Sequence, residues 1–392
     1  MRIVYYTHPA FLEPCLELVR ELAPEVELHL MLEVAPSAWR SGAFDLRPPA
    51  VGPGLVPADP LLAPAFPPAV REAWRRAASF QLVVHRAPQS LHPASVAVGR
   101  DVLRFIRAVR ADLVHIDDTD VSPRLALVSP GLRRWPVVVN VHDPVPHLGE
   151  AGWRKTLARR LLYRRANRFV VFGDCFRRPL ARRAGVSLAH VRSIHLAPYG
   201  VVGAWADGPA EQEERLVLLF GRLGAYKGID TLVAAARLAA ERVPGLRLVV
   251  AGRPLPGFRP SEPVPLANGG TVELRLGYLP PAELVRLVRR ATIVVCPYRD
   301  ASQSGVLLTA FGLGRTVIAT TAGALPEYVR PGVDGLLVPP GDAAALADAM
   351  SALLTDPAAR RRLEAGVREP GRPGWRAAAA DLLAIYSELA RA

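Results

Sequence analysis

Lysine is almost absent from this chain of 392 residues, and cysteine is rare. Arginine supplies all but two of the 49 basic residues, and the two lysines are Lys155 and Lys227. The three cysteines, Cys15, Cys175 and Cys296, lie far apart and form no Cys-x-x-Cys or Cys/His group. These absences exclude a disulfide-rich scaffold and the zinc modules built on paired cysteines, and the sequence predicts no bound metal.

Long apolar runs are also missing. No stretch reaches the roughly 18 residues that a membrane-spanning helix needs. The first residues, MRIVYYTH, enter a predicted strand directly and lack the charged and apolar regions of a signal peptide. We therefore expect a cytoplasmic protein. Because 50% of the residues are hydrophobic, the chain can build large cores, and its length predicts two domains rather than one.

The net charge of +13 comes mostly from one segment. Residues 153–183 hold eleven basic side chains and a single acid, a net charge of +10. No zinc-finger or RNA-stacking motif accompanies them, so we expect no nucleic-acid partner. Two interpretations remain open. Either the apolar positions Trp153, Leu157, Leu161 and Leu162 pack a surface helix on the sheet and the cations are solvated, or the basic segment contacts the anionic inner face of a membrane.

Apolar, β-branched runs alternate with helical patterns along the chain. This alternation is typical of parallel, doubly wound sheets, so the predicted fold class is α/β. In the first half, strands are expected at 2–6, 26–30, 81–85, 113–116, 137–141 and 169–172. The proline-rich segment 48–68 is expected to be an irregular loop.

A linker is expected at 199–213, where the periodicity is lost and Gly, Pro and acidic residues accumulate. The predicted domains are therefore residues 1–200 and 213–370. Residues 371–392 form a strong helical pattern of their own.

Two strand–turn–helix units in the second half carry residues suited to binding an anion. After a strand at 292–295 and a polar turn, Ser304 stands at a helix N-cap position, and Gly305 lets an anion approach the backbone. The first N–H groups of a helix have no partner within it, and its dipole favours an anion there. After a strand at 215–220, Arg222 and Lys227 flank a glycine-spaced turn. The two cations and the helix N-terminus together predict a diphosphate site. The alternative is an ordinary βα connection with a serine N-cap, which would show the same sequence pattern.

These stretches, FGRLGAYKGIDTL and SQSGVLLTAFGLGRTVIATTAGALPEYVRPGVDGLLVPPGD, resemble the retaining glycosyltransferases of family four over most of residues 213–355. The resemblance implies the GT-B fold, in which two Rossmann-like, doubly wound parallel-sheet domains face each other across a cleft and the last helix crosses back to the first domain. It also implies a hexose donor in the form of a nucleotide-diphosphate sugar, no required metal or other cofactor, and a glycan, lipid-linked or small-molecule acceptor. The residues that it assigns to the donor diphosphate are Arg222, Lys227, Ser304, Gly305 and Val306. Both cationic side chains are expected to end in a solvent-accessible cleft.

The sequence departs from the family at two positions where glutamate is common, which here hold Ala301 and Thr309. We expect Asp300 and Gln303 to contact the donor sugar in place of the first glutamate, and the Thr309 hydroxyl to contact the ribose in place of the second. The missing glutamates also support an alternative, a catalytically silent GT-B subunit that activates a partner. A sugar-nucleotide epimerase of the same fold is a second alternative.

Two further residues have a family position near the donor. His142 follows the strand at 137–141 and is expected to face the donor sugar, as a third catalytic residue beside Arg222 and Lys227; the alternative is a turn histidine bonded to Asp143. Tyr278 is expected beside the nucleobase, although an aromatic residue at a strand end usually packs. For His8 we expect a structural role.

Overall fold

The computed structural model describes residues 1–36, 40–41, 44–46, 51–87, 89–118, 124–145, 153–208, 211–259, 265–369 and 373–391. The chain forms two compact units. Unit 1 comprises Met1–Ala197 and Pro373–Ala392, and unit 2 comprises Pro198–Arg372. The last helix thus belongs with the N-terminal half of the chain, as the GT-B expectation required.

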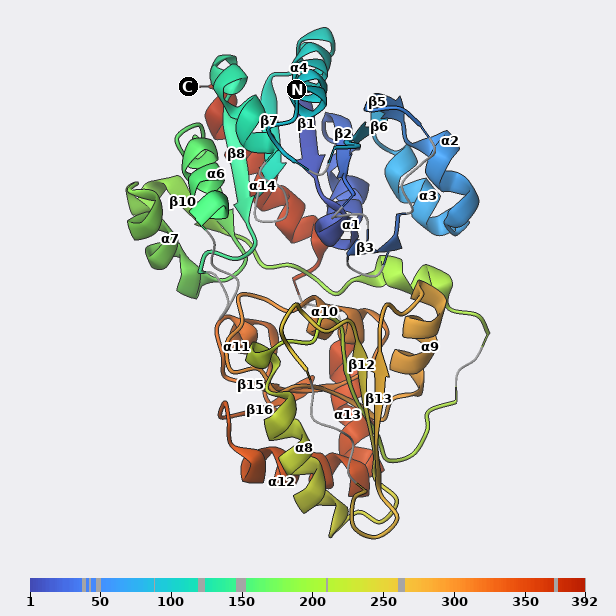
Figure 1. Ribbon diagram of the computed structural model, residues 1–392. Helices are drawn as coiled ribbons and strands as arrows, with labels where there is room; N and C mark the ends of the chain where they lie inside the picture. The colour runs from blue at the N-terminus through green and yellow to red at the C-terminus, as the bar shows by residue number, and fades with distance from the viewer. Residues whose placement is uncertain are drawn as a thin grey trace. The chain divides into compact units, whose positions relative to one another are not determined.

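Unit 1 is built on an eight-stranded sheet with the strand order β10-β9-β8-β7-β1-β2-β6-β5 (Figure 1). All its neighbouring strands are parallel except β5, which is antiparallel to β6. The strands are β1 (Arg2–Thr7), β2 (Glu27–Val34), β5 (Gly54–Pro57), β6 (Ser79–Val84), β7 (Leu113–Asp117), β8 (Val137–Val141), β9 (Arg168–Val171) and β10 (Val191–Ser193). A separate pair is β3 (Arg40–Ser41) with β4 (Phe44–Asp45).

The helices of unit 1 connect these strands and cover the sheet. They are α1 (Leu12–Leu22), α2 (Asp59–Leu62), α3 (Pro68–Arg75), α4 (Pro93–Ala108), α5 (Leu125–Val128), α6 (Trp153–Tyr163), α7 (Arg177–Ala184) and α14 (Trp375–Ala390). α14 packs on α1 and buries Leu382, Tyr386 and Leu389, which recur at helical spacing. Its apolar face therefore completes the core of unit 1.

Unit 2 has a six-stranded, wholly parallel sheet with the order β13-β12-β11-β14-β15-β16 (Figure 1). Its strands are β11 (Leu216–Phe220), β12 (Arg247–Gly252), β13 (Thr271–Leu276), β14 (Ile293–Cys296), β15 (Val317–Thr320) and β16 (Gly335–Val338). Its helices are α8 (Ile229–Ala240), α9 (Pro281–Arg290), α10 (Gly305–Gly312), α11 (Leu325–Tyr328), α12 (Ala343–Thr355) and α13 (Pro357–Val367). β11 and β14 are buried at every position, because helices cover both faces of a parallel sheet.

Each sheet reverses its strand order once. In unit 1 the chain builds outward from β1 through β2 and β6, and then returns to the other side of β1 with β7. In unit 2 it builds from β11 through β12 to β13, and then returns to the other side of β11 with β14. The loops at the carboxyl ends of such a strand pair diverge and leave a crevice where α/β proteins bind ligands. The fold thus selects two places, one in each unit.

The loop predicted at 48–68 is wrong in part. Its described residues include the edge strand β5, the short helix α2 and a 3-10 turn at Ala63–Ala65. Proline is tolerated at both positions. Pro57 is the last residue of an edge strand, and Pro60 lies in the first turn of α2, where the backbone N–H has no partner within the helix.

Candidate functional site

The candidate site of unit 2 lies on the two loops that follow β11 and β14, at the point where the strand order reverses. Two glycines bring these loops together. Gly228 has φ +64°, and a Cβ there would lie 2.0 Å from the carbonyl oxygen of Pro297. Gly221 has φ +99°, and a Cβ there would lie 3.1 Å from the Val306 side chain in the first turn of α10. At Gly228 both the positive φ and the close approach to backbone require glycine, and at Gly221 the positive φ favours it.

The two predicted phosphate-binding cations both lie on the β11 loop, but in different environments. Arg222 is exposed, as expected. Lys227 is buried, with only 6% of its surface exposed, so the prediction that its side chain ends in solvent is wrong. The Lys227 Nζ donates to the Tyr298 hydroxyl at 2.5 Å and lies 3.9 Å from the centre of the Tyr298 ring. Burial lowers the pKa of Lys227 to about 7, because a charged ammonium loses its hydration there.

Ser304 is the N-cap of α10, as the sequence predicted. Its backbone is extended, and its Oγ accepts a hydrogen bond from the Leu307 N–H at 3.2 Å. Val306 is buried and Gly305 is half-buried. The helix α10 is apolar and buried along most of its length, so its first turn is held rigidly at the edge of the sheet.

The two positions that depart from the family are both buried. Ala301 is 2% exposed and Thr309 is 6% exposed. A Cβ on Gly323 would lie 1.5 Å from the Ala301 carbonyl oxygen, so the loop is packed tightly against the turn after β15. Asp300 and Gln303 are half-buried on the same loop, and Gln303 Oε1 has no hydrogen-bond partner among the described residues. The ribose contact of Thr309 and the sugar contacts of Asp300 and Gln303 stay predictions.

Tyr278 lies beside a cavity at the carboxyl end of β13. The cavity has a volume of about 340 Å³ and is lined by Arg275, Leu276, Gly277, Tyr278, Leu279 and Glu283. The Arg275 guanidinium donates to Glu273 at 2.6 Å, and this bond lowers the pKa of the Glu273 carboxyl. Tyr278 is thus on the wall of a cavity rather than in the core, and its contact with a nucleobase stays a prediction.

In unit 1 the strand-order reversal holds a buried polar network around Asp117, the last residue of β7. Its carboxylate accepts hydrogen bonds from His142 Nε2 at 2.9 Å, from Asn140 Nδ2 at 2.9 Å and from Thr7 Oγ1 at 2.5 Å. Burial alone would raise the pKa of Asp117, but the hydrogen bonds from His142 and Thr7 lower it below its ordinary value. An ionised carboxylate only accepts, so His142 Nε2 carries the proton of their bond.

His142 is therefore bonded to a partner other than the one considered from the sequence. The alternative of a turn histidine bonded to Asp143 is corrected: the bond goes to Asp117, 25 residues earlier in the chain. The His142 ring is 4% exposed and stacks on Phe11, with 3.5 Å between the ring centres and 4° between the planes. Its Nδ1 has no hydrogen-bond partner among the described residues. The expected contact with the donor sugar stays a prediction.

The network extends to the last helix. The His115 ring stacks on Tyr5 at 4.3 Å, and its Nδ1 lies 2.5 Å from the hydroxyl of Tyr386 in α14. Burial lowers the pKa of His115 to about 4, so this ring is neutral near pH 7. α14 is thereby joined to the same strand ends as Asp117.

A second group of buried polar side chains lies at the ends of β1, β2 and β6. Glu33 accepts a hydrogen bond from the Tyr6 hydroxyl at 2.6 Å and pairs with Arg124 at 3.8 Å. His8 follows β1, is fully buried, and makes no hydrogen bond from either ring nitrogen to the described residues. His85 is also buried, which lowers its pKa. The structural role expected for His8 stays a prediction.

Tyr298 and Asp117 were not selected as site residues from the sequence. Both lie at or just after the carboxyl end of a strand beside a strand-order reversal. That signal depends on knowing which strands are neighbours, which a single sequence does not give for parallel strands far apart in the chain.

Sequence similarity to known proteins is found over the part of the chain that holds the candidate site of unit 2. Residues 214–356 match the family Glycosyl transferases group 1. The D-inositol 3-phosphate glycosyltransferase of Corynebacterium glutamicum (strain R) is 35% identical over 181 residues, which are 44% of this chain and 43% of that protein. The protein of the same name from Mycobacterium tuberculosis (strain F11) is 29% identical over 247 residues, 59% and 51% of the two chains. The aligned part spans about half the length of these curated relatives.

Similar solved structures cover the whole chain. Anabaena HepE in complex with UDP and glucose has a TM-score of 0.68 at 17% identity, covering 99% of this chain and 100% of that one. Sucrose-phosphate synthase from Thermosynechococcus elongatus has a TM-score of 0.63 at 19% identity, covering 99% of each chain. At these identities the likeness concerns the fold, which confirms the predicted pair of parallel-sheet α/β units. Residues 214–356 are therefore similar to the Glycosyl transferases group 1 family, and the chain has the GT-B fold.

Proposed function

We propose that this protein is a glycosyltransferase that moves a hexose from a nucleotide-diphosphate sugar to a glycan, lipid-linked or small-molecule acceptor with retention of anomeric configuration. The observation that carries the proposal is the convergence of Arg222, Lys227 and the N-terminus of α10 on two adjacent loops at the strand-order reversal of unit 2. Two cations and a helix N-terminus suit a diphosphate. The family match over residues 214–356 supports the same assignment.

The chemistry asked of these residues is stabilisation of a leaving group. When the bond to the sugar breaks, negative charge develops on the departing diphosphate, and preorganised cations and N–H dipoles lower the energy of that state. The helix dipole contributes roughly 0.3–2 kcal/mol, so Arg222 and Lys227 must contribute more. We propose that this arrangement replaces a metal ion. We also propose that His142, oriented by Asp117, contacts the donor sugar.

A nucleotide screen followed by a transfer assay tests this function. Thermal shifts with UDP, GDP, ADP and TDP identify the base, and the matching sugar nucleotides are then incubated with candidate acceptors. The expected result is acceptor-dependent release of the nucleotide diphosphate, with an axial or equatorial product bond that matches the donor by NMR. Nucleotide binding without transfer would favour the catalytically silent subunit. Ala301 and Thr309, which replace the family's two glutamates and are buried, support that alternative. Conversion of the free sugar nucleotide would favour the epimerase.

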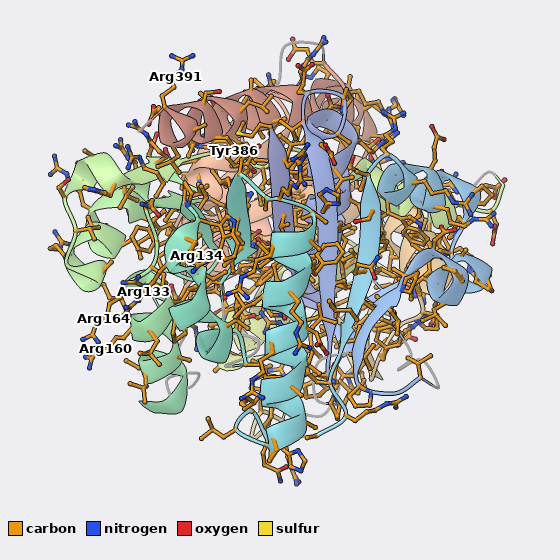
Figure 2. The ribbon with its side chains drawn as sticks, turned by 90° about the horizontal axis from the view of Figure 1, so that it is seen from above. Arg133, Arg134, Arg160, Arg164, Tyr386 and Arg391 are labelled. Carbon is orange, nitrogen blue, oxygen red and sulfur yellow. The ribbon has the colours of Figure 1, made fainter. Side chains whose placement is uncertain are left out.

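We further propose that unit 1 contacts an anionic membrane from the cytoplasm, near a lipid-linked acceptor. In the part of the chain that the structure describes, no helix is both long and apolar enough to span a bilayer. On α6, however, Leu157 is 51% exposed and Leu161 is 38% exposed, so the interpretation in which these leucines pack on the sheet is wrong. Arg160 and Arg164 are exposed near them, and Figure 2 shows their side chains on the same side of unit 1 as Arg133 and Arg134.

These four arginines should give salt-sensitive membrane attachment. Each cation near an anionic surface contributes about 1 kcal/mol, and salt screens the effect beyond about 8–10 Å. We expect the protein to co-sediment with anionic vesicles at low salt and to be released by 0.5 M salt. Changing Arg133, Arg134, Arg160 and Arg164 to Gln should abolish the attachment.

The matched control removes four exposed arginines from unit 2, namely Arg237, Arg286, Arg361 and Arg362. It lowers the net charge by the same amount and should still bind. Arg159 is kept in every variant, because it is buried and pairs with Asp118 at 2.9 Å. Equal recovery with anionic and neutral vesicles at low salt would refute the membrane proposal.

A further inference from the structure

Tyr298 connects the two parts of the proposed diphosphate site. It follows the end of β14 by two residues and is 1% exposed. Its backbone carbonyl accepts a hydrogen bond from the Thr320 hydroxyl at 2.6 Å, which fixes it to the neighbouring strand β15. Gly228 keeps the β11 loop against Pro297, the residue before it. The position of the Tyr298 side chain is therefore determined by both loops of the site.

The Tyr298 hydroxyl bonds to one residue on each loop. It accepts from Lys227 Nζ at 2.5 Å, and it lies 3.1 Å from the Ser304 Oγ. The Ser304 Oγ in turn accepts from the Leu307 N–H in the first turn of α10. A continuous chain of hydrogen bonds thus runs from the ammonium to the helix N-terminus. The ring face adds a second contact, since Nζ lies 3.9 Å from its centre, within the range of a cation–π interaction.

Lys227 has no acidic partner among the described residues. The charged or ionisable groups that act on it are Cys296 and Arg222, and neither is a carboxylate. Buried cations are normally paired with an anion. The hydroxyl and ring of Tyr298 are the nearest described contacts of this ammonium, and the Tyr226 ring lies further away, with its centre 5.6 Å from Nζ. A bound anion would supply the missing counter-charge.

We propose that Tyr298 is a positioning residue of the diphosphate site: it holds the Lys227 ammonium in line with Ser304 and the first turn of α10, so that one anionic group meets all three. This inference rests on the proposed function, because it takes the anion to be the diphosphate of the donor. Tyr298 itself contacts the cation and the cap, and it acts on the ligand through them.

The order of the hydrogen bonds follows the charge of Lys227. When Lys227 is an ammonium, Nζ donates to Tyr298 and the Tyr298 hydroxyl is free to donate to Ser304. When Lys227 is a neutral amine, Tyr298 donates to Nζ instead. Because burial lowers the pKa of Lys227 to about 7, the free protein holds mostly the amine at pH 8. An anion beside Nζ favours the ammonium, so binding at pH 8 should take up about one proton.

The test uses the full-length chain, with inorganic pyrophosphate and the nucleoside diphosphate that gives the largest thermal shift as probes. Calorimetry at pH 8 in buffers of different ionisation enthalpy measures Kd and proton uptake together. Wild type should take up about one proton, and Lys227→Met should take up none. Tyr298→Phe keeps the ring and removes the hydroxyl, so we expect Kd to rise about tenfold. Without the hydroxyl that accepts from the ammonium, Lys227 should take up its proton at a lower pH. The affinity of Tyr298→Phe for the probe should therefore rise at a lower pH than the affinity of wild type does.

The matched control is Tyr163→Phe in unit 1, which also removes a buried hydroxyl, here one that donates to Asp118 at 3.1 Å. It should change neither Kd nor proton uptake. A Tyr298→Phe protein with wild-type Kd and wild-type pH dependence would overturn the inference, even if it were less stable. Transfer of sugar by that variant at the wild-type rate would do the same while leaving the proposed function intact. Tight, Tyr298-dependent binding without any sugar transfer would reject the function and keep the inference, and binding of neither probe by wild type would reject both.

Discussion

Replacing Arg222 by alanine or Lys227 by methionine should lower kcat/KM for the sugar nucleotide by about 30- to 1,000-fold, which corresponds to roughly 2–4 kcal/mol of transition-state stabilisation. Each change removes a cation from the loop that follows β11, where we propose that it stabilises the negative charge on the departing diphosphate. Methionine suits position 227 because that side chain is buried against the Tyr298 ring, and alanine would leave a void. Initial rates over a range of donor concentrations measure the effect.

The control for this prediction is Arg299→Ala. Arg299 is an exposed cation on the other loop, and its side chain is bonded to Asp230 at 2.5 Å. Its removal should change kcat/KM less than about threefold, as expected for an exposed ion pair. Both variants of the diphosphate site should keep the wild-type circular dichroism spectrum. Near-normal kcat/KM in both Arg222→Ala and Lys227→Met would reject their proposed roles.

The same lysine predicts the pH dependence of the reaction. In the proposed site Lys227 binds the diphosphate as an ammonium, and burial lowers its pKa to about 7 in the free protein. Above that value the cation is lost, so kcat/KM should fall about tenfold per pH unit between pH 7.5 and 9. Lys227→Met, although much slower, should lack this descending limb. A wild-type profile that stays level to pH 9 would contradict the environment described for Lys227.

The sequence predicted the fold well because the decisive signals are local. Runs such as 137–141 and 293–296 are apolar and β-branched, and they alternate with helical patterns, so a parallel sheet covered on both faces is the expected outcome. The N-cap at Ser304 and the exposed position of Arg222 were also predicted, because each residue follows a predicted strand. The sequence pattern could not predict how deeply a given side chain is buried. Lys227 was expected to end in a solvent-accessible cleft, but it is buried, and its burial depends on Pro297 and Tyr298, some 70 residues away.

The surface of α6 shows a second limit of pattern reading. From the sequence, Leu157, Leu161 and Leu162 were expected to pack on the sheet together. Residues five apart in a helix lie about 140° apart around its axis, so Leu157 and Leu162 cannot face the same way. Only Leu162 is buried, while Arg159 takes an inward position because Asp118 provides a counter-charge. The buried side of α6 is therefore the one that carries Arg159 and Leu162, and Leu157 and Leu161 lie on the exposed side.

Asp117→Ala should produce the largest loss of stability expected in unit 1. The change leaves donors from His142, Asn140 and Thr7 buried without their acceptor, which costs about 3–5 kcal/mol. Hydrogen exchange followed by mass spectrometry reports this locally: amides of β1, β7 and β8 should exchange about two to four orders of magnitude faster than in wild type. Asp112→Ala is the control, because Asp112 is exposed and accepts a hydrogen bond from the Arg2 backbone N–H at 2.7 Å.

The dependence of stability on acid pH is an independent test of the role of the Asp117 carboxylate, and the direction of the change can be predicted. Its pKa is lowered in the folded protein, so folding is favoured by the ionised carboxylate at pH values above the unfolded pKa of about 3.9, and this contribution is lost as the pH falls toward the folded pKa. Asp117→Asn keeps the shape and removes the charge. Wild type should therefore protect β7 amides better than Asp117→Asn at pH 7, and the difference should shrink as the pH falls below about 4. A difference that stays constant down to pH 3 would mean that the carboxylate charge does not stabilise this network, and that His142 is held by packing against Phe11 instead.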